Sequence, residues 1–176
     1  LKKIRALKFK KMISISGPDR YYENGKDVLR WRQSEDLAEL TIKRRASAKE
    51  TFVREEIDLK IESQPKEDVE NFISMLGFKH SFTIKKDCHI FWFPDSNGEA
   101  CVCAYKVFSD SRPTLYVIEI EAPKGLAVSL SKKMVSKWEK VLKISARKRV
   151  NKSLYEIYSG KRTRLADKTS IEKAKS

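Results

Sequence analysis

The chain has 176 residues, of which 38 are Lys or Arg and 24 are Asp or Glu, so its formal net charge is +14. This length fits one domain with a core of its own. A composition that is 40% hydrophobic and 35% charged excludes a disordered or membrane-spanning chain. The positive charge implies an anionic partner, which can be a nucleic acid, a phosphorylated small molecule or a membrane surface.

The hydrophobic pattern predicts mainly antiparallel strands with a few helices. Helices are expected at Leu1–Leu7, Pro65–Leu76 and Leu130–Ile144, with a short helical turn at Lys152–Tyr158. Strands are expected at Lys10–Ser16, Val28–Gln33, Ala38–Arg45, Thr51–Glu62, His80–Phe93, Ala100–Phe108 and Leu115–Glu121. Turn residues separate them at Gly17-Pro18-Asp19, Asn24-Gly25, Pro94-Asp95-Ser96-Asn97-Gly98 and Ser111-Arg112-Pro113. Residues 1–158 are expected to form the domain, and residues 159–176 a mobile basic tail.

Several predicted strands alternate apolar and charged residues, which places the charged residues on one face. In the second strand, for example, Arg30 and Arg32 alternate with Leu29 and Trp31. The charged faces together carry Arg30, Arg32, Lys43, Arg45, Arg54, Glu56, Asp58, Glu119 and Glu121. If helices cover the apolar faces, these residues line the concave side or the interior of a curved sheet, where they would hold a polyanion and Mg²⁺ or Mn²⁺. The pattern alone leaves open that the charged faces are simply exposed to water.

The three cysteines, Cys88, Cys101 and Cys103, are odd in number and clustered. This is not a disulfide framework, and with no recognisable secretory signal it favours a reducing, cytoplasmic compartment. A zinc site built from Cys88, His89, Cys101 and Cys103 would lack paired CxxC spacing. The sequence therefore favours buried cysteines that act as small apolar side chains.

Several short motifs in order resemble the CYTH domain of the triphosphate tunnel metalloenzyme superfamily. They are DRYY (19–22), LRWRQ (29–33), ELTIKRR (39–45), VREEIDL (53–59), LGF (76–78), IKKD (84–87), VIEIEA (117–122) and KSLYEIY (152–158). The resemblance spans roughly residues 7–158. It implies an α+β fold: an antiparallel barrel of about eight strands with helices packed outside and a tunnel for a triphosphate.

The resemblance also implies roles for the charged residues. Lys43, Arg54 and Glu56 correspond to catalytic positions, and Glu56, Glu119 and Glu121 to ligands of Mg²⁺ or Mn²⁺. The substrate-binding positions are Arg30, Arg32, Lys43, Arg45, Arg54 and Lys86, of which Arg45, like Asp58, shares the face without a firm motif match.

Three departures from the family pattern limit this transfer. The family's ExExK strand is missing, so that strand either lies upstream or is absent from the protein. Cys88 stands where the family often has an arginine, and residues 104–107 offer no aspartate before the closing strand. A barrel that has lost metal ligands would bind triphosphates without turnover.

Two functions follow. The first is a metal-dependent enzyme that hydrolyses an inorganic, thiamine, nucleoside or RNA 5′ triphosphate, or cyclises ATP as class IV-type adenylate cyclases do. The alternative is a non-catalytic nucleotide- or nucleic-acid-binding protein that uses its basic C-terminal segment, since phosphate contacts dominate such binding. A membrane partner is disfavoured because no apolar anchor accompanies the basic helix.

Overall fold

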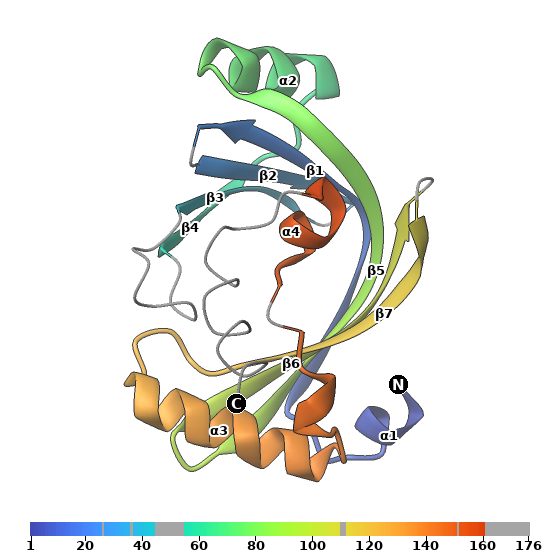
Figure 1. Ribbon diagram of the computed structural model, residues 1–176, viewed down its shortest axis with the longest axis vertical. Helices are drawn as coiled ribbons and strands as arrows, with labels where there is room; N and C mark the ends of the chain where they lie inside the picture. Colours follow the sequence, from blue (N-terminus) through green and yellow to red (C-terminus); the bar gives the residue numbers. More distant parts are fainter. Residues whose placement is uncertain (26, 36, 45–54, 110–111, 151, 161–176) are drawn as a thin grey trace, which may run out of the picture. The chain divides into compact units, whose positions relative to one another are not determined.

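The computed structural model describes residues 1–25, 27–35, 37–44, 55–109, 112–150 and 152–160. Its elements are α1 (Lys2–Arg5), β1 (Lys11–Asn24), β2 (Asp27–Gln33), β3 (Ala38–Arg44), β4 (Glu55–Ile61), α2 (Lys66–Met75), β5 (Lys79–Asp95), β6 (Gly98–Ser109), β7 (Arg112–Glu121), α3 (Val128–Val141), the 3-10 helix η1 (Ala146–Lys148) and α4 (Leu154–Ser159) (Figure 1). Every predicted helix and strand overlaps one of these elements. None of the helices in the described ranges is long and apolar enough to cross a membrane.

The strands form a seven-stranded sheet in the order β4-β3-β2-β1-β5-β6-β7. The pairings of β2 with β1 and β3, of β3 with β4, and of β6 with β5 and β7 are all antiparallel. The α+β class is therefore confirmed. Within the described ranges the strand order ends at β4 and at β7, and the residues before β1 form α1 and no strand. The predicted closed barrel of about eight strands is thus not confirmed.

Two compact units divide the chain. Unit 1 comprises Leu1–Pro18 and Ile84–Arg149, and unit 2 comprises the described residues of Asp19–Thr83 and those from Val150 onward. The long strands β1 and β5 contribute a segment to each unit, so unit 2 holds the end of β1 and the start of β5.

In unit 2, α2 covers the apolar face of β1 and β2. Val69 and Ile73 of the helix pack with Tyr22, Leu29 and Trp31, and both Ile73 and Trp31 are fully buried. The predicted alternation is confirmed here, because the arginines of β2 lie on the face away from this cluster.

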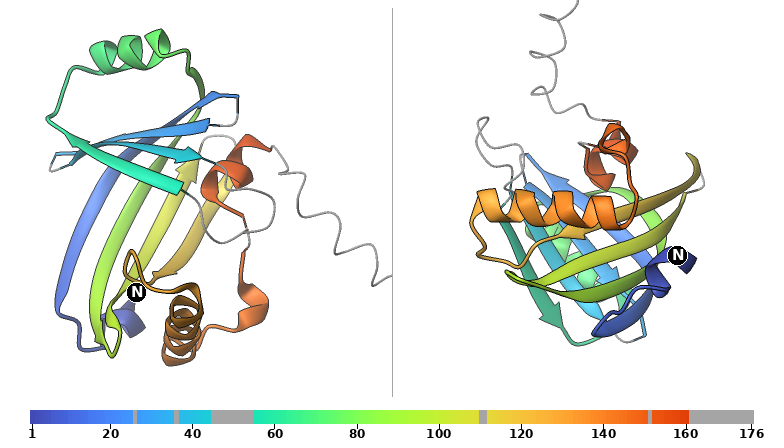
Figure 2. Two further views of the ribbon diagram at one scale, coloured as in Figure 1. Left: turned by 90° about the vertical axis from the view of Figure 1, so that its left-hand side faces the viewer. Right: turned by 90° about the horizontal axis from the view of Figure 1, so that it is seen from below.

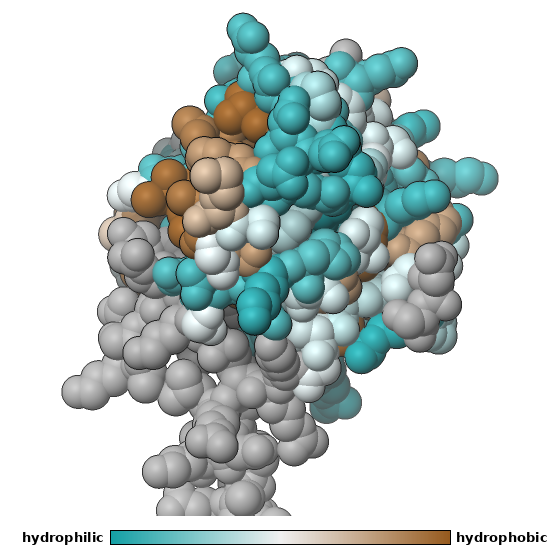
Figure 3. Space-filling model, turned by 90° about the horizontal axis from the view of Figure 1, so that it is seen from above, coloured by the Kyte–Doolittle hydropathy of each residue, from teal (hydrophilic) through white to brown (hydrophobic). Residues whose placement is uncertain are grey.

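The ends of α2 follow from its sequence. Two acidic residues occupy its first turn, where the helix dipole favours negative charge. The helix ends before Gly77, whose φ of 81° lies in the left-handed region that closes many helices. Phe72 and Met75 remain exposed, and hydrophobic patches interrupt the hydrophilic surface in the view from the α2 side (Figure 3).

In unit 1, α3 packs on β5 and β6 (Figure 2). Its Met134 and Trp138 contact a cluster that includes Phe91, Phe93 and Val102, all three fully buried. Burying an aromatic side chain of this size contributes roughly 1.5–3 kcal/mol. This cluster therefore holds α3 against the strands that carry the unit's candidate site.

Two predicted turns are wrong. Gly17-Pro18-Asp19 lies inside β1, whose pairing with β2 begins at Asp19, directly after Pro18. Proline lacks the N–H that strand pairing needs. It is tolerated at position 18 because the pairing with β2 begins only at the next residue. Arg112 and Pro113 belong to β7, in which Arg112 already pairs with Ser109 of β6, and Ser111 lies outside the described residues.

Candidate functional site

The predicted charged residues of unit 2 that the structure describes lie on one face of β2, β3 and β4. In the register, Arg30 is opposite Thr41, and Thr41 is opposite Asp58. Lys43 is likewise opposite Glu56. Directly opposed residues of antiparallel strands share a face. These five side chains therefore form one polar surface, named here the β2–β4 polar face, on the side away from α2.

Arg30 is largely buried, and its guanidinium group has both paired and unpaired nitrogen atoms. Its Nη2 donates to Glu39 and to the Thr41 hydroxyl, both at 2.7 Å, and its side chain is 12% exposed. Its Nε is buried and has no hydrogen-bond partner within the described residues. A buried N–H without an acceptor costs free energy, so the Nε of Arg30 is a donor that a bound anion would satisfy.

Arg32 has a structural partner. It donates from Nε and Nη2 to Asp19 at 2.5 and 2.6 Å, and the Asp19 side chain is fully buried. Burial alone would lower the pKa of Arg32, but the hydrogen bonds and charge of Asp19 raise it above its usual value. Arg32 therefore stays ionised, and its N–H groups that do not face Asp19 are left for another ligand.

Lys43 and Glu56 form an ion pair of 2.8 Å on the same polar face. Both side chains are only partly exposed, at 25% and 34%. Asp58 accepts a hydrogen bond of 3.0 Å from Thr41. Arg45 and Arg54, which were also expected here, lie outside the described residues.

Helix α4 is tied to the end of β1 within unit 2. The hydroxyl of Tyr155 donates to Glu23, and its ring lies 5.8 Å from that of Phe82. Phe82 in turn stacks on Tyr21 at 4.8 Å. Tyr21 and Glu23 alternate with Tyr22, so α4 lies on the face opposite the one that α2 covers.

The predicted residues of unit 1 have different surroundings. Lys86 is buried, with its Nζ 4.1 Å from the centre of the Tyr105 ring, in a cation–π contact. Glu119 and Glu121 are exposed on β7, opposite Cys103 and Cys101 of β6. The two glutamates therefore share a face with the two thiols.

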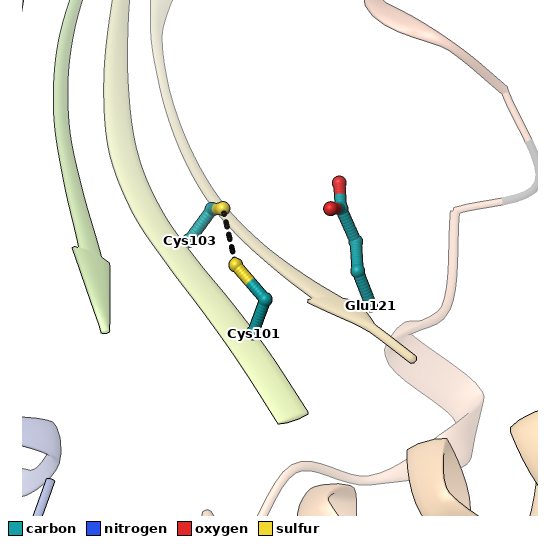
Figure 4. A group of neighbouring side chains, drawn as sticks. All are labelled: Cys101, Cys103 and Glu121. Carbon is teal, nitrogen blue, oxygen red and sulfur yellow. Dashed lines mark hydrogen bonds between the residues drawn. The ribbon is translucent and has the colours of Figure 1, made fainter. Parts of the chain in front are cut away.

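The thiols form a cluster that the sequence did not favour. The Sγ atoms of Cys101 and Cys103 are 3.7 Å apart, and none of the three cysteines forms a disulfide. A carboxylate oxygen of Glu121 lies within 4.8 Å of both sulfur atoms (Figure 4). Cys88 is buried and hydrogen-bonds to Cys103 through its side chain.

His89 does not belong to this cluster, contrary to the zinc set considered from the sequence. Its Nδ1 is 2.7 Å from the hydroxyl of Ser14. Adjacent residues of a strand point to opposite faces, so Cys88 and His89 cannot face one ligand together. The same alternation, combined with the register of β7, is the signal that could have exchanged His89 for Glu121.

Comparison with known proteins shows similarity in fold. No protein-family model matches the chain, and no curated protein matches it. A conserved hypothetical protein from Pyrococcus furiosus matches with a TM-score of 0.66 and 18% identity, over 88% of this chain and 90% of its own. The PH1819 protein from Pyrococcus horikoshii OT3 matches with a TM-score of 0.66 and 20% identity, over 92% of each chain. A "putative adenylate cyclase" from Bacillus halodurans matches with a TM-score of 0.53 and 16% identity, over 82% of each chain. The chain shares the fold of these proteins.

Proposed function

We propose that the chain binds a triphosphate compound together with Mg²⁺ or Mn²⁺ and either hydrolyses it or, with ATP, cyclises it. The observation that carries this proposal is the β2–β4 polar face, where Arg30 and Lys43 lie on adjacent strands and the buried Nε of Arg30 has no acceptor in the described ranges. The fold shared with the Bacillus protein, whose name is that of a cyclase, supports the same chemistry.

Arg30 and Lys43 would bind phosphate oxygens in different ways. Arg30 offers a planar group, and Lys43 offers a point charge. The Lys43–Glu56 pair is partly exposed and therefore weak enough for a more highly charged anion to replace Glu56. The Arg30–Glu39 pair is largely buried, so Arg30 would keep Glu39 and offer its unpaired Nε instead. Arg32 adds its remaining N–H groups, while its bonds to Asp19 fix the position of its guanidinium group.

The other predicted residues keep the roles that the resemblance gives them. Lys86, Arg45 and Arg54 bind substrate, and Arg54 with Lys43 and Glu56 stabilises the reacting phosphate. Glu119 and Glu121 project exposed carboxylates from one face of β7, and oxygen donors of this kind fit Mg²⁺ or Mn²⁺. The resemblance assigns Glu56 to metal binding as well. When bound, such an ion supplies neutralisation of phosphate charge.

The test is turnover of a panel of triphosphates with Mg²⁺ and with Mn²⁺. The panel holds inorganic triphosphate, thiamine triphosphate, ATP, GTP and an RNA with a 5′ triphosphate end, and the assay measures released phosphate and cyclic nucleotide. Lys43→Ala and Glu119→Ala are each expected to lower kcat by about 10²–10³-fold, as losing a charge-stabilising group does elsewhere. A chelator is expected to stop the reaction.

Lys106→Ala is the matched control. Lys106 lies on β6, and its Nζ is 4.3 Å from the centre of the Phe108 ring, on the face away from Cys103 and Tyr105. This variant is expected to keep the rate of the unaltered chain. Equal rates for all three variants would refute the site, and a chain that neither binds nor turns over any member of the panel would refute the function.

The α3 surface favours a second candidate, a nucleic-acid-binding protein. A shallow hollow there is lined by Lys132, Lys133, Lys137 and Lys140. Phosphate-backbone binding by such lysines falls steeply with salt and needs no divalent metal. Affinity for a labelled RNA at 50 and 200 mM salt distinguishes the two functions, because an enzyme of the first kind depends on the metal instead.

A further inference from the structure

The distance between the two thiol sulfur atoms on β6 can be compared with that of a disulfide and that of a zinc site. A disulfide needs its sulfur atoms about 2.05 Å apart, whereas Cys101 and Cys103 hold theirs at 3.7 Å. Two thiolates that bind one tetrahedral zinc ion at about 2.3 Å each lie about 3.8 Å apart. The observed distance, spanned here by a thiol–thiol hydrogen bond, would therefore let both sulfur atoms bind one zinc ion with little movement.

The neighbouring strand β7 adds a third ligand. Glu121 lies opposite Cys101 in the register, and its oxygen is within 4.8 Å of both sulfur atoms. Cys101, Cys103 and Glu121 thus supply three mutually close donors, and a water molecule would complete a tetrahedral zinc site. Cys88, on the other side of β6, lies beside this group through its hydrogen bond with Cys103 and is not one of the three.

The surroundings suit a bound metal ion. Cys88 and Cys103 are buried, Cys101 is partly exposed, and Glu121 is exposed, so one side of the cluster is open to water. A metal ion can therefore enter from the Glu121 side and reach the sulfur atoms of Cys101 and Cys103. Thiolate ligands favour Zn²⁺ over Mg²⁺ and Mn²⁺, which prefer oxygen.

We propose that Cys101, Cys103 and Glu121 form a binding site for one Zn²⁺ ion. The site lies within unit 1 alone. It shares Glu121 with the Mg²⁺ or Mn²⁺ ligands proposed above, but none of the residues proposed to bind phosphate belongs to it.

The experiment titrates the reduced full chain with Zn²⁺ against a chromogenic chelator and measures bound metal by mass spectrometry under native conditions. One ion per chain is expected, and Co²⁺ in its place should give a thiolate charge-transfer band. Cys101→Ser and Cys103→Ser should each weaken zinc binding by more than about 100-fold, because even residues behind the ligands cost 10–100-fold.

His89→Gln is the matched control. It removes a residue type that binds zinc well, but His89 lies on β5 and faces away from the thiols. It should leave zinc affinity unchanged. Thermal unfolding shows that each variant is folded, and zinc should raise the Tm of the unaltered chain and of His89→Gln but not that of Cys101→Ser.

Three results would overturn the proposal. The reduced chain could bind no stoichiometric zinc, both cysteine variants could keep the zinc affinity of the unaltered chain, or Cys101 and Cys103 could form a disulfide and bind no zinc. The proposed function fails separately. Cys101→Ser should weaken zinc binding without altering a proposed phosphate ligand, whereas Lys43→Ala should lower kcat without altering the thiols.

Discussion

The two units place charged residues on comparable strand faces but stabilise them in different ways. In unit 2, cations pair with carboxylates across or along neighbouring strands, as Arg32 does with Asp19 and Lys43 with Glu56. In unit 1, Lys86 lies over an aromatic ring, and the glutamates of β7 are opposite thiols. Unit 2 thus neutralises its cations with carboxylates, whereas unit 1 places a cation over an aromatic ring and carboxylates beside thiols.

Breaking the buried ion pair should have the largest effect in this comparison. Asp19→Asn leaves Arg32 with one acceptor where it had two charged oxygens, in a place where the Asp19 side chain is fully buried. Removing one member of a buried pair typically costs about 3–5 kcal/mol. Chemical denaturation should show a loss of unfolding free energy of this size.

A second replacement makes this prediction sharper. Adding Arg32→Met to Asp19→Asn removes the unpaired charge and should recover part of the lost stability. If Asp19→Asn alone costs less than about 1 kcal/mol, the two residues do not act as a buried ion pair, and the contrast between the units disappears.

The buried carboxylate of unit 1 should have a smaller and pH-dependent effect. Asp95 accepts hydrogen bonds from Lys137 at 2.7 Å and from the Trp138 indole at 3.0 Å, which attach α3 to the end of β5. The hydrogen bond from Lys137 lowers the pKa of Asp95, against its desolvation, with further help from Trp138 and Ser96. Asp95→Asn should cost about 1–3 kcal/mol at neutral pH.

The sign of the pH effect follows from the lowered pKa. The stabilisation is present above the pKa of an unfolded Asp, about 3.9, and is lost as the pH falls through the lower pKa of the folded state. The difference in unfolding free energy between the unaltered chain and Asp95→Asn should therefore shrink below about pH 4. A constant difference from pH 7 down to pH 2 would show that the carboxylate charge is irrelevant. Glu139, whose pKa is lowered by Arg149, keeps some acid sensitivity in both chains.

The strand faces could be predicted from the sequence, but the partners of the charged residues could not. Alternation alone assigned Arg30 and Trp31 to opposite faces, and the helix α2 covers the predicted one. Asp19, however, was expected in a turn because it follows Gly-Pro, and its bond to Arg32 depends on a register that extends β1 past the proline. The pairing of strands far apart in sequence has no local signal.

The thiol cluster illustrates the same limit. Cys101 and Cys103 share a face by alternation, which was readable, but the position of Glu121 beside them depends on how β7 pairs with β6. Spacing rules for zinc motifs describe ligands on turns and helices, so they do not recognise ligands from neighbouring strands.

The helix caps give the smallest predicted effect and compare the two units directly. In unit 2, Ser153 caps α4 in a reciprocal arrangement with Glu156, whereas in unit 1 the residue before α3 is Ala127, which makes no side-chain cap. Ser153→Ala should lower the unfolding free energy by about 1 kcal/mol, and Ala127→Ser should raise it by a similar or smaller amount. Ser153→Thr retains a hydroxyl acceptor and serves as the control. The backbone of Ala127 (φ −54°, ψ 140°) is already in the extended region that capping residues adopt, so the added hydroxyl needs no backbone change to reach the first turn of α3. Urea denaturation measures the change in unfolding free energy. A loss for Ser153→Ala and a gain for Ala127→Ser would show that α4 is already capped and α3 is not, whereas changes of the same sign would contradict this.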